Sequence, residues 1–139
     1  MTATRLQRTL ALVFLVLGGW CVVAPRMVEA LTIRPGYQVL NATSAVFIAC
    51  FGAQAMLCGT LAWFARFTPT TFLAFGLVGS VPFFAFNAYF YFVEPIFTRW
   101  MLLDFVGNVV ILACGVWGYR LARADLTREA AGAAQRPAR

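Results

Sequence analysis

Four apolar segments, each about as long as a membrane-spanning helix, constrain this chain more than any other feature of its sequence. They cover about residues 9–24, 43–65, 70–93 and 100–119. A helix of roughly 20 mainly apolar residues is enough to cross a bilayer. Because 62% of the 139 residues are hydrophobic and only 12% are charged, little of the chain is left for a soluble domain. The sequence therefore predicts an all-α integral membrane protein, with a four-helix bundle over residues 1–120 and a cytoplasmic tail over 121–139. This tail is expected to begin as an extension of the last helix and to be disordered toward its end.

The arginine residues predict the orientation of the bundle and the kind of membrane. Arg26, Arg34 and Arg99 lie at the ends of the spans on one side, whereas the other arginines lie at the opposite ends. By the positive-inside rule, this distribution places both termini and the loop at Arg66 in the cytoplasm. All the basic residues are arginine, which is typical of a GC-rich bacterial genome. We therefore expect a multi-pass protein of the bacterial inner (cytoplasmic) membrane.

The net charge of +6 does not indicate a nucleic-acid partner. A nucleic-acid surface combines basic residues with exposed aromatic side chains on one face, whereas the aromatic residues of this chain lie inside its apolar segments. We expect membrane lipids as partners, together with a larger membrane-protein complex or a homo-oligomer, and no nucleic acid.

Two segments permit more than one interpretation. Residues 1–30 resemble a secretory signal peptide cleaved after Ala30, although the length of the apolar run favours a retained helix. The connector over residues 25–41 is expected to be exposed, with a short helix on the outer surface over its first half as the alternative. In its second half, the sequence Arg34-Pro35-Gly36 is typical of a turn.

The chain contains no histidine, which argues against most redox and metal chemistry for this chain alone. Histidine is the usual haem ligand and the commonest metal ligand in proteins. The four cysteines lie within predicted spans and form no CxxC pair, so we interpret them as small packing residues. The sequence pairs no nucleophile with a base and has no phosphate-binding glycine loop. We therefore expect no catalytic residue, no metal and no cofactor.

Three polar residues within the spans form a candidate ligand site. Asn87 lies in the outer half of the third span, and Asp104 and Asn108 lie one helical turn apart in the outer half of the fourth. Because these spans run in opposite directions, we expect the three side chains to meet at a similar depth. Polar groups within a membrane are costly and need partners. The structural alternative is an ion pair between Asp104 and Arg99 at the outer surface.

The stretch from Pro82 to Pro95 is rich in aromatic residues. Phe83, Phe86 and Phe90 follow helical spacing and would contact the apolar body of a ligand, while Tyr91 shares the polar face with Asn87. Phe86 and Phe90 are also the candidate residues for contact with a partner protein. Packing within the membrane and an aromatic belt at its surface are the non-functional interpretations. Pro82 is expected to kink the third span and to open an outward-facing crevice.

The length, the short basic N-terminus, the early Gly18-Gly19 and the four spans resemble the small DoxX-like bacterial membrane proteins, whose members are largely uncharacterised. This resemblance covers roughly residues 5–120 and implies the fold only. Two functions stay open. The first is a non-catalytic accessory or assembly subunit of a larger membrane complex. The second is a lipid or small-molecule binding protein, or a carrier, that uses the polar and aromatic crevice.

Overall fold

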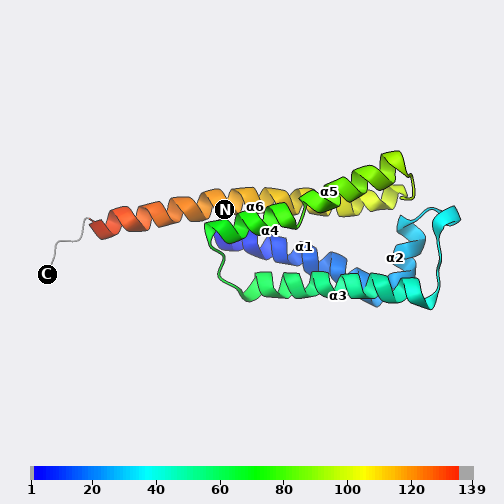
Figure 1. Cartoon of the computed structure of the whole chain (residues 1–139). Helices are drawn as coiled ribbons and strands as arrows, with labels where there is room; N and C mark the ends of the chain where they lie inside the picture. The colour runs from blue at the N-terminus through cyan, green and yellow to red at the C-terminus, as the bar shows by residue number, and fades with distance from the viewer. Residues whose placement is uncertain (1, 135–139) are drawn as a thin grey trace.

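The computed structural model describes residues 2–134, and this part of the chain is helical apart from short connections (Figure 1). Its α-helices are α1 (Ala3–Val23), α2 (Pro25–Thr32), α3 (Ala42–Phe64), α4 (Pro69–Val78), α5 (Val81–Ala88) and α6 (Leu102–Ala134). Four segments are long and apolar enough to cross a membrane: Ala3–Val23, Ala42–Phe64, Pro69–Val93 and Arg99–Ala133. These segments confirm the predicted all-α fold with four candidate spans.

The long helices pack as two antiparallel pairs (Figure 1). Helix α1 packs along α3, α4 packs along α6, and α1 also packs against α6. Glycines allow a close approach within each pair. A Cβ atom added at Gly18 would lie 2.7 Å from the backbone oxygen of Gly52, and one added at Gly76 would lie 2.8 Å from the Cα atom of Gly115. Small residues of this kind let helix backbones touch.

The buried core lies toward the end of the bundle where α1 begins, which we call the N-terminal end. It is formed by Leu6, Leu10, Ala11, Ala62, Phe72, Ile111 and Cys114. The Gln7 side-chain amide donates to the backbone oxygens of Ala62 and Ala65, at 2.7 Å each. These carbonyls lie at the C-terminal end of α3, where the last carbonyl groups of a helix have no N–H group of the same helix to bind. Gln7 thus joins α1 to the end of α3.

The third span is broken between α4 and α5, slightly before the expected kink at Pro82. The carbonyl of Val78 would pair with the amide of residue 82, and proline has no N–H to donate. Helix α4 therefore ends at Val78, and Pro82 lies in the first turn of α5, where a proline is tolerated. The Ser80 hydroxyl donates to the carbonyl oxygen of Gly76. The span ends in a π-helical turn, η2 (Tyr89–Val93).

The connector after α1 contains the short helix α2, so the alternative prediction holds for its first half. Pro25 begins this helix, and a single 3-10 turn, η1 (Pro35–Tyr37), follows at the expected turn. Helix α2 lies across the other end of the bundle, next to the 3-10 turn η3 (Arg99–Met101) that leads into α6 (Figure 1). We call this end of the bundle the α2 end.

Helix α6 continues to Ala134. The helical extension that the sequence predicted at the start of the tail is present, but it is longer than expected and includes residues predicted to be disordered. The segment consists largely of alanine, leucine, arginine and glutamate, which have high helix propensities. Side chains one turn apart also interact, because Arg123 donates to the Tyr119 hydroxyl at 2.8 Å and Arg128 lies 3.7 Å from Asp125. Residues 135–139 of the predicted tail lie outside the described residues.

Candidate functional site

Asn87, Asp104 and Asn108 meet at the α2 end of the bundle, as expected from their similar positions along two antiparallel spans. Asp104 lies in the first turn of α6, Asn108 one turn later, and Asn87 near the end of α5. The Asn87 amide nitrogen donates to Oδ2 of Asp104 at 2.9 Å, and the Asn108 amide nitrogen donates to the same oxygen at 2.8 Å. Asn87 and Asn108 are buried, with 7% and 4% of their surface exposed. The two amides hold the carboxyl group of Asp104 in one orientation.

The second carboxyl oxygen of Asp104 has no protein donor within residues 2–134. Both amides bind Oδ2, and no buried side-chain oxygen in this part of the chain lacks a partner, so Oδ1 is accessible. The alternative ion pair with Arg99 does not form among the described residues, whose one salt bridge joins Arg128 to Asp125. Asp104 therefore has one oxygen held by the protein and one oxygen free for another donor.

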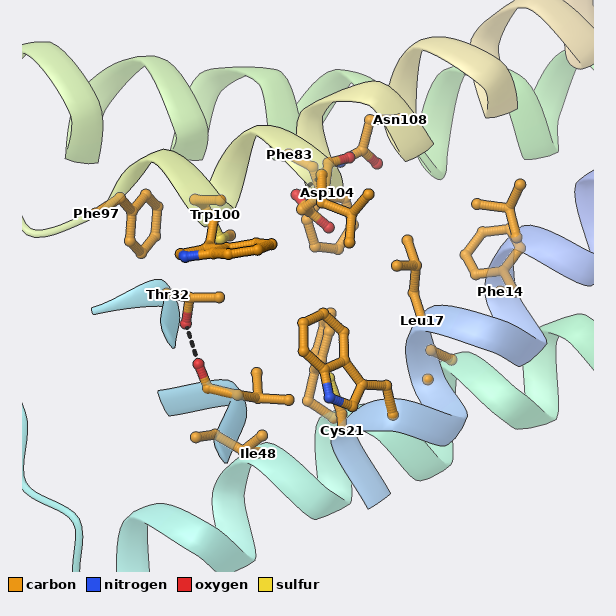
Figure 2. A pocket seen from close by; sticks show the side chains of 18 of the residues that line it. Phe14, Leu17, Cys21, Thr32, Ile48, Phe83, Phe97, Trp100, Asp104 and Asn108 are labelled. Atoms are coloured by element: carbon orange, nitrogen blue, oxygen red, sulfur yellow. Dashed lines mark hydrogen bonds between the residues drawn. The ribbon is translucent and has the colours of Figure 1, made fainter. Parts of the chain in front are cut away.

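A cavity of about 290 Å³ lies beside Asp104, between the α1 and α3 pair and the α5 and α6 pair. Figure 2 shows Asp104 and Phe83 on one side of this cavity, and Leu17 and Cys21 on the other. The lining is almost entirely apolar. Its side chains from α1 and α3 include Val13, Phe14, Leu17, Trp20, Cys21, Phe47, Ile48 and Phe51. The cavity thus combines apolar walls with one carboxyl group.

The cavity is open between the helices rather than sealed. Phe47, Phe51, Trp100 and Leu103 line it, and 71%, 49%, 58% and 47% of their respective surfaces are exposed. Phe51 of α3 and Phe83 of α5 are in contact across one side, with ring centroids 6.0 Å apart. Since these helices are long enough to cross a bilayer, such openings would face acyl chains.

Helix α2 covers the cavity through Val28 and Thr32, and Glu29 attaches this helix to the start of α3. Oε1 of Glu29 accepts the backbone N–H groups of Val39 at 2.7 Å and Leu40 at 2.9 Å, and Oε2 accepts the Ser44 hydroxyl at 2.6 Å. Hydrogen bonds from the Leu40 amide and the Ser44 hydroxyl lower the pKa of Glu29 below its ordinary value. The charged form of Glu29 is therefore the form that holds α2 in place.

The structure divides the predicted site residues among three places. Phe83, Asp104 and Asn108 line the cavity. Asn87 and Tyr91 line a separate hollow of about 170 Å³ between the end of α5 and the start of α6. Phe86 and Phe90 line neither space. Phe86 is 57% exposed, and Phe90 packs against Phe97, with ring centroids 5.5 Å apart. The single crevice that the sequence predicted is thus two spaces, on either side of the hydrogen bond between Asn87 and Asp104.

Sequence reasoning missed the contribution of α1 and α3 to the cavity. Leu17, Cys21 and Ile48 are ordinary apolar residues of membrane helices, and their spacing does not distinguish a cavity wall from a lipid-facing surface. Thr32 and Val28 were missed for another reason, since the sequence left open whether their segment is helical.

Comparison of the chain with family models, with curated proteins and with solved structures gives no match.

Proposed function

We propose that this protein binds a lipid or another amphipathic small molecule in the cavity beside Asp104. The observation that carries the proposal is the free Oδ1 of Asp104 at the wall of an otherwise apolar cavity. Ligand sites commonly combine apolar walls with a few polar groups that fix the orientation of the ligand. An apolar body would pack against the rings of Phe83 and Phe51, and a hydroxyl or amine would donate to Oδ1.

The neighbours of Asp104 support a binding role, because they orient the carboxyl group before a ligand arrives. Asn87 also donates to the Phe83 carbonyl at 2.9 Å, and Asn108 donates to the Asp104 carbonyl at 2.8 Å, so each amide has a second contact that limits its rotation. A polar group that is already held in position loses less freedom when it binds. We therefore propose a binding role without catalysis.

The test is ligand retention by Asp104→Asn in mild detergent, measured by native mass spectrometry. The probes are a long-chain amine, alcohol and carboxylic acid with the same chain. The amine and the alcohol should bind the native protein, and Asp104→Asn should lower retention of the amine by about tenfold, the equivalent of one charge-assisted hydrogen bond. Asp125→Asn is the matched control, since Asp125 is 59% exposed on the extension of α6. Unchanged retention by Asp104→Asn would refute the site.

A second candidate function, an accessory subunit of a larger membrane complex, is favoured by the aromatic residues outside the cavity. Phe86 stacks on Phe90 with their planes 5° apart, and Phe92 is 80% exposed. These rings would face either acyl chains or a partner helix. Purification from the native membrane in mild detergent should then recover a stoichiometric protein partner, which Phe86→Ala should release. Recovery of the chain alone would count against this function.

The bacterial inner membrane, the cytoplasmic location of both termini and the resemblance to DoxX-like proteins stay proposals that the arginine distribution and the four spans support. A reporter that is active only in the cytoplasm, fused to the C-terminus, would test the orientation.

A further inference from the structure

Two connectors at the α2 end are joined by backbone hydrogen bonds. The Arg34 amide donates to the Ile96 carbonyl at 2.9 Å, and the Thr98 amide donates to the Thr32 carbonyl at 2.8 Å. The Thr98 hydroxyl adds a bond to the Leu31 carbonyl. These contacts form an isolated antiparallel bridge around Ile33 and Phe97. The connector after α2 and the connector before α6 are therefore held in one register.

This bridge places Arg34 and Arg99 on the wall of the same surface hollow, with Tyr91 and Thr98. Both arginines are exposed, and neither pairs with a carboxylate in the described part of the chain. Nε of Arg34 donates to the Phe97 carbonyl at 3.1 Å, which orients the guanidinium group while its terminal nitrogens make no bond to residues 2–134. Two arginines thus line one hollow, and neither has a carboxylate partner among residues 2–134.

The arginine hollow adjoins the Asp104 cavity, because Phe97 and Trp100 line both spaces. Figure 2 shows these two rings at the edge of the cavity, on the same side as Asp104. A ligand in the arginine hollow would therefore lie against Phe97 and Trp100, the two residues that this hollow shares with the Asp104 cavity.

We propose that the ligand is a single-chain amphiphile that carries a phosphate monoester, held by Arg34 and Arg99 while its chain occupies the Asp104 cavity. The guanidinium group matches the geometry of phosphate oxygens and can bind them through paired hydrogen bonds. A cavity of about 290 Å³ is at the lower limit for small-molecule sites, which favours one chain over two. A hydroxyl between the phosphate and the chain would donate to Oδ1 of Asp104.

This inference rests on the proposed function, and the experiment separates the two. The full-length protein in mild detergent is titrated by native mass spectrometry with monoacylglycerol phosphate, monoacylglycerol phosphocholine, monoacylglycerol and glycerol phosphate. The first three share the chain and the free hydroxyl and differ in head-group charge, and the fourth has no chain. Monoacylglycerol phosphate should bind about tenfold more tightly than the other three, as expected for charge-assisted bonds to two arginines.

The decisive variant is Arg99→Gln, because the Arg99 side chain makes no hydrogen bond within the described structure and its loss should leave the bridge intact. Arg99→Gln should remove the preference for the phosphate monoester. Arg120→Gln, an exposed arginine on α6, is the matched control and should keep it. Added salt should weaken the preference in the native protein, since exposed charges are screened.

Several outcomes would overturn the inference. Equal binding of the three monoacyl probes, or a preference that survives in Arg99→Gln, would show that the arginines do not hold the phosphate. Equal binding of glycerol phosphate would show that the chain contributes nothing. An acidic protein partner that needs Arg99 would mean that the hollow serves another class of molecule. If the probes bind without a phosphate preference but still require Asp104, the proposed function stands and only this inference fails. If none binds, both fail.

Discussion

Replacing Glu29 with alanine should release α2 from the start of α3 and uncover the Asp104 cavity. Glu29 is 2% exposed, and its carboxylate accepts three hydrogen bonds, from the Val39 amide, the Leu40 amide and the Ser44 hydroxyl. Alanine removes all three and leaves the two backbone N–H groups without a partner. The expected result is a less stable α2 end and an unchanged N-terminal end, because the buried core lies at the N-terminal end.

The magnitude follows from these contacts. A hydrogen bond to a charged group contributes about 1.5–3 kcal/mol, so three such bonds set an upper limit of about 9 kcal/mol. Water reduces this loss, since Val39 and Leu40 are 62% and 44% exposed and their freed amides can be hydrated. Leu40 also has a φ of 47°, a left-handed conformation that costs about 1–2 kcal/mol and could relax. We expect the free energy of unfolding to fall by about 2–4 kcal/mol.

The assay combines equilibrium unfolding in mixed micelles with hydrogen exchange of the Val39 and Leu40 amides. Glu29→Ala should lower the free energy of unfolding and expose both amides to exchange. Glu129→Ala, at an exposed position of α6, is the control and should change stability by less than about 0.5 kcal/mol. If Glu29→Ala behaves like this control and the two amides stay protected, Glu29 does not attach α2 and the reasoning is refuted.

Two further predictions concern pH and packing. The pKa of Glu29 is lowered in the folded protein, so the contribution of Glu29 to stability is complete above its ordinary pKa of about 4.5. This contribution is lost as the pH falls through the pKa of the folded state. Glu29→Gln should abolish the resulting acid dependence of hydrogen exchange at the Leu40 amide. Gly115→Leu should destabilise the bundle by about 1–3 kcal/mol or more in the unfolding assay, because a Cβ atom there would lie 2.5 Å from the Gly76 Cα atom. Gly132→Leu, with no atom within 4 Å, is its control, and equal effects of the two would contradict the packing argument.

The parts of the fold that depend on local sequence could be predicted. A run of apolar residues predicts a span because the bilayer imposes its thickness on the helix, and all four candidate spans have this origin. The meeting of Asn87 with Asp104 followed from equal depth on two antiparallel helices. A polar group within a span also needs a partner nearby, which left few alternatives for Asp104. Depth and polarity were sufficient to place this trio.

The parts that depend on helix rotation and spacing could not be predicted. Phe86 and Phe90 follow the same helical spacing as Phe83, yet only Phe83 lines the cavity. A pattern of apolar residues predicts a helix face but does not say which neighbour that face contacts. The role of Glu29 could not be predicted, because its partners are the amides of residues 39 and 40, which a sequence pattern does not bring together. The start of the helix beyond residue 120 was expected, but its length was not, because residues 129–134 have no apolar face that would indicate a helix.

The hollow of about 170 Å³ between α5 and α6 arises from a change in side-chain size along the pair formed by the third and fourth spans. Near the middle of this pair, Gly76 and Gly115 bring the backbones of α4 and α6 into contact. Toward the α2 end, Phe84 and Phe105 separate α5 from α6, with ring centroids 5.2 Å apart. Because the chain also breaks after Val78, α5 can diverge from the direction of α4 without straining the close contact. Glycine contacts near the break and paired rings beyond it are therefore the sequence features that produce this hollow between α5 and α6.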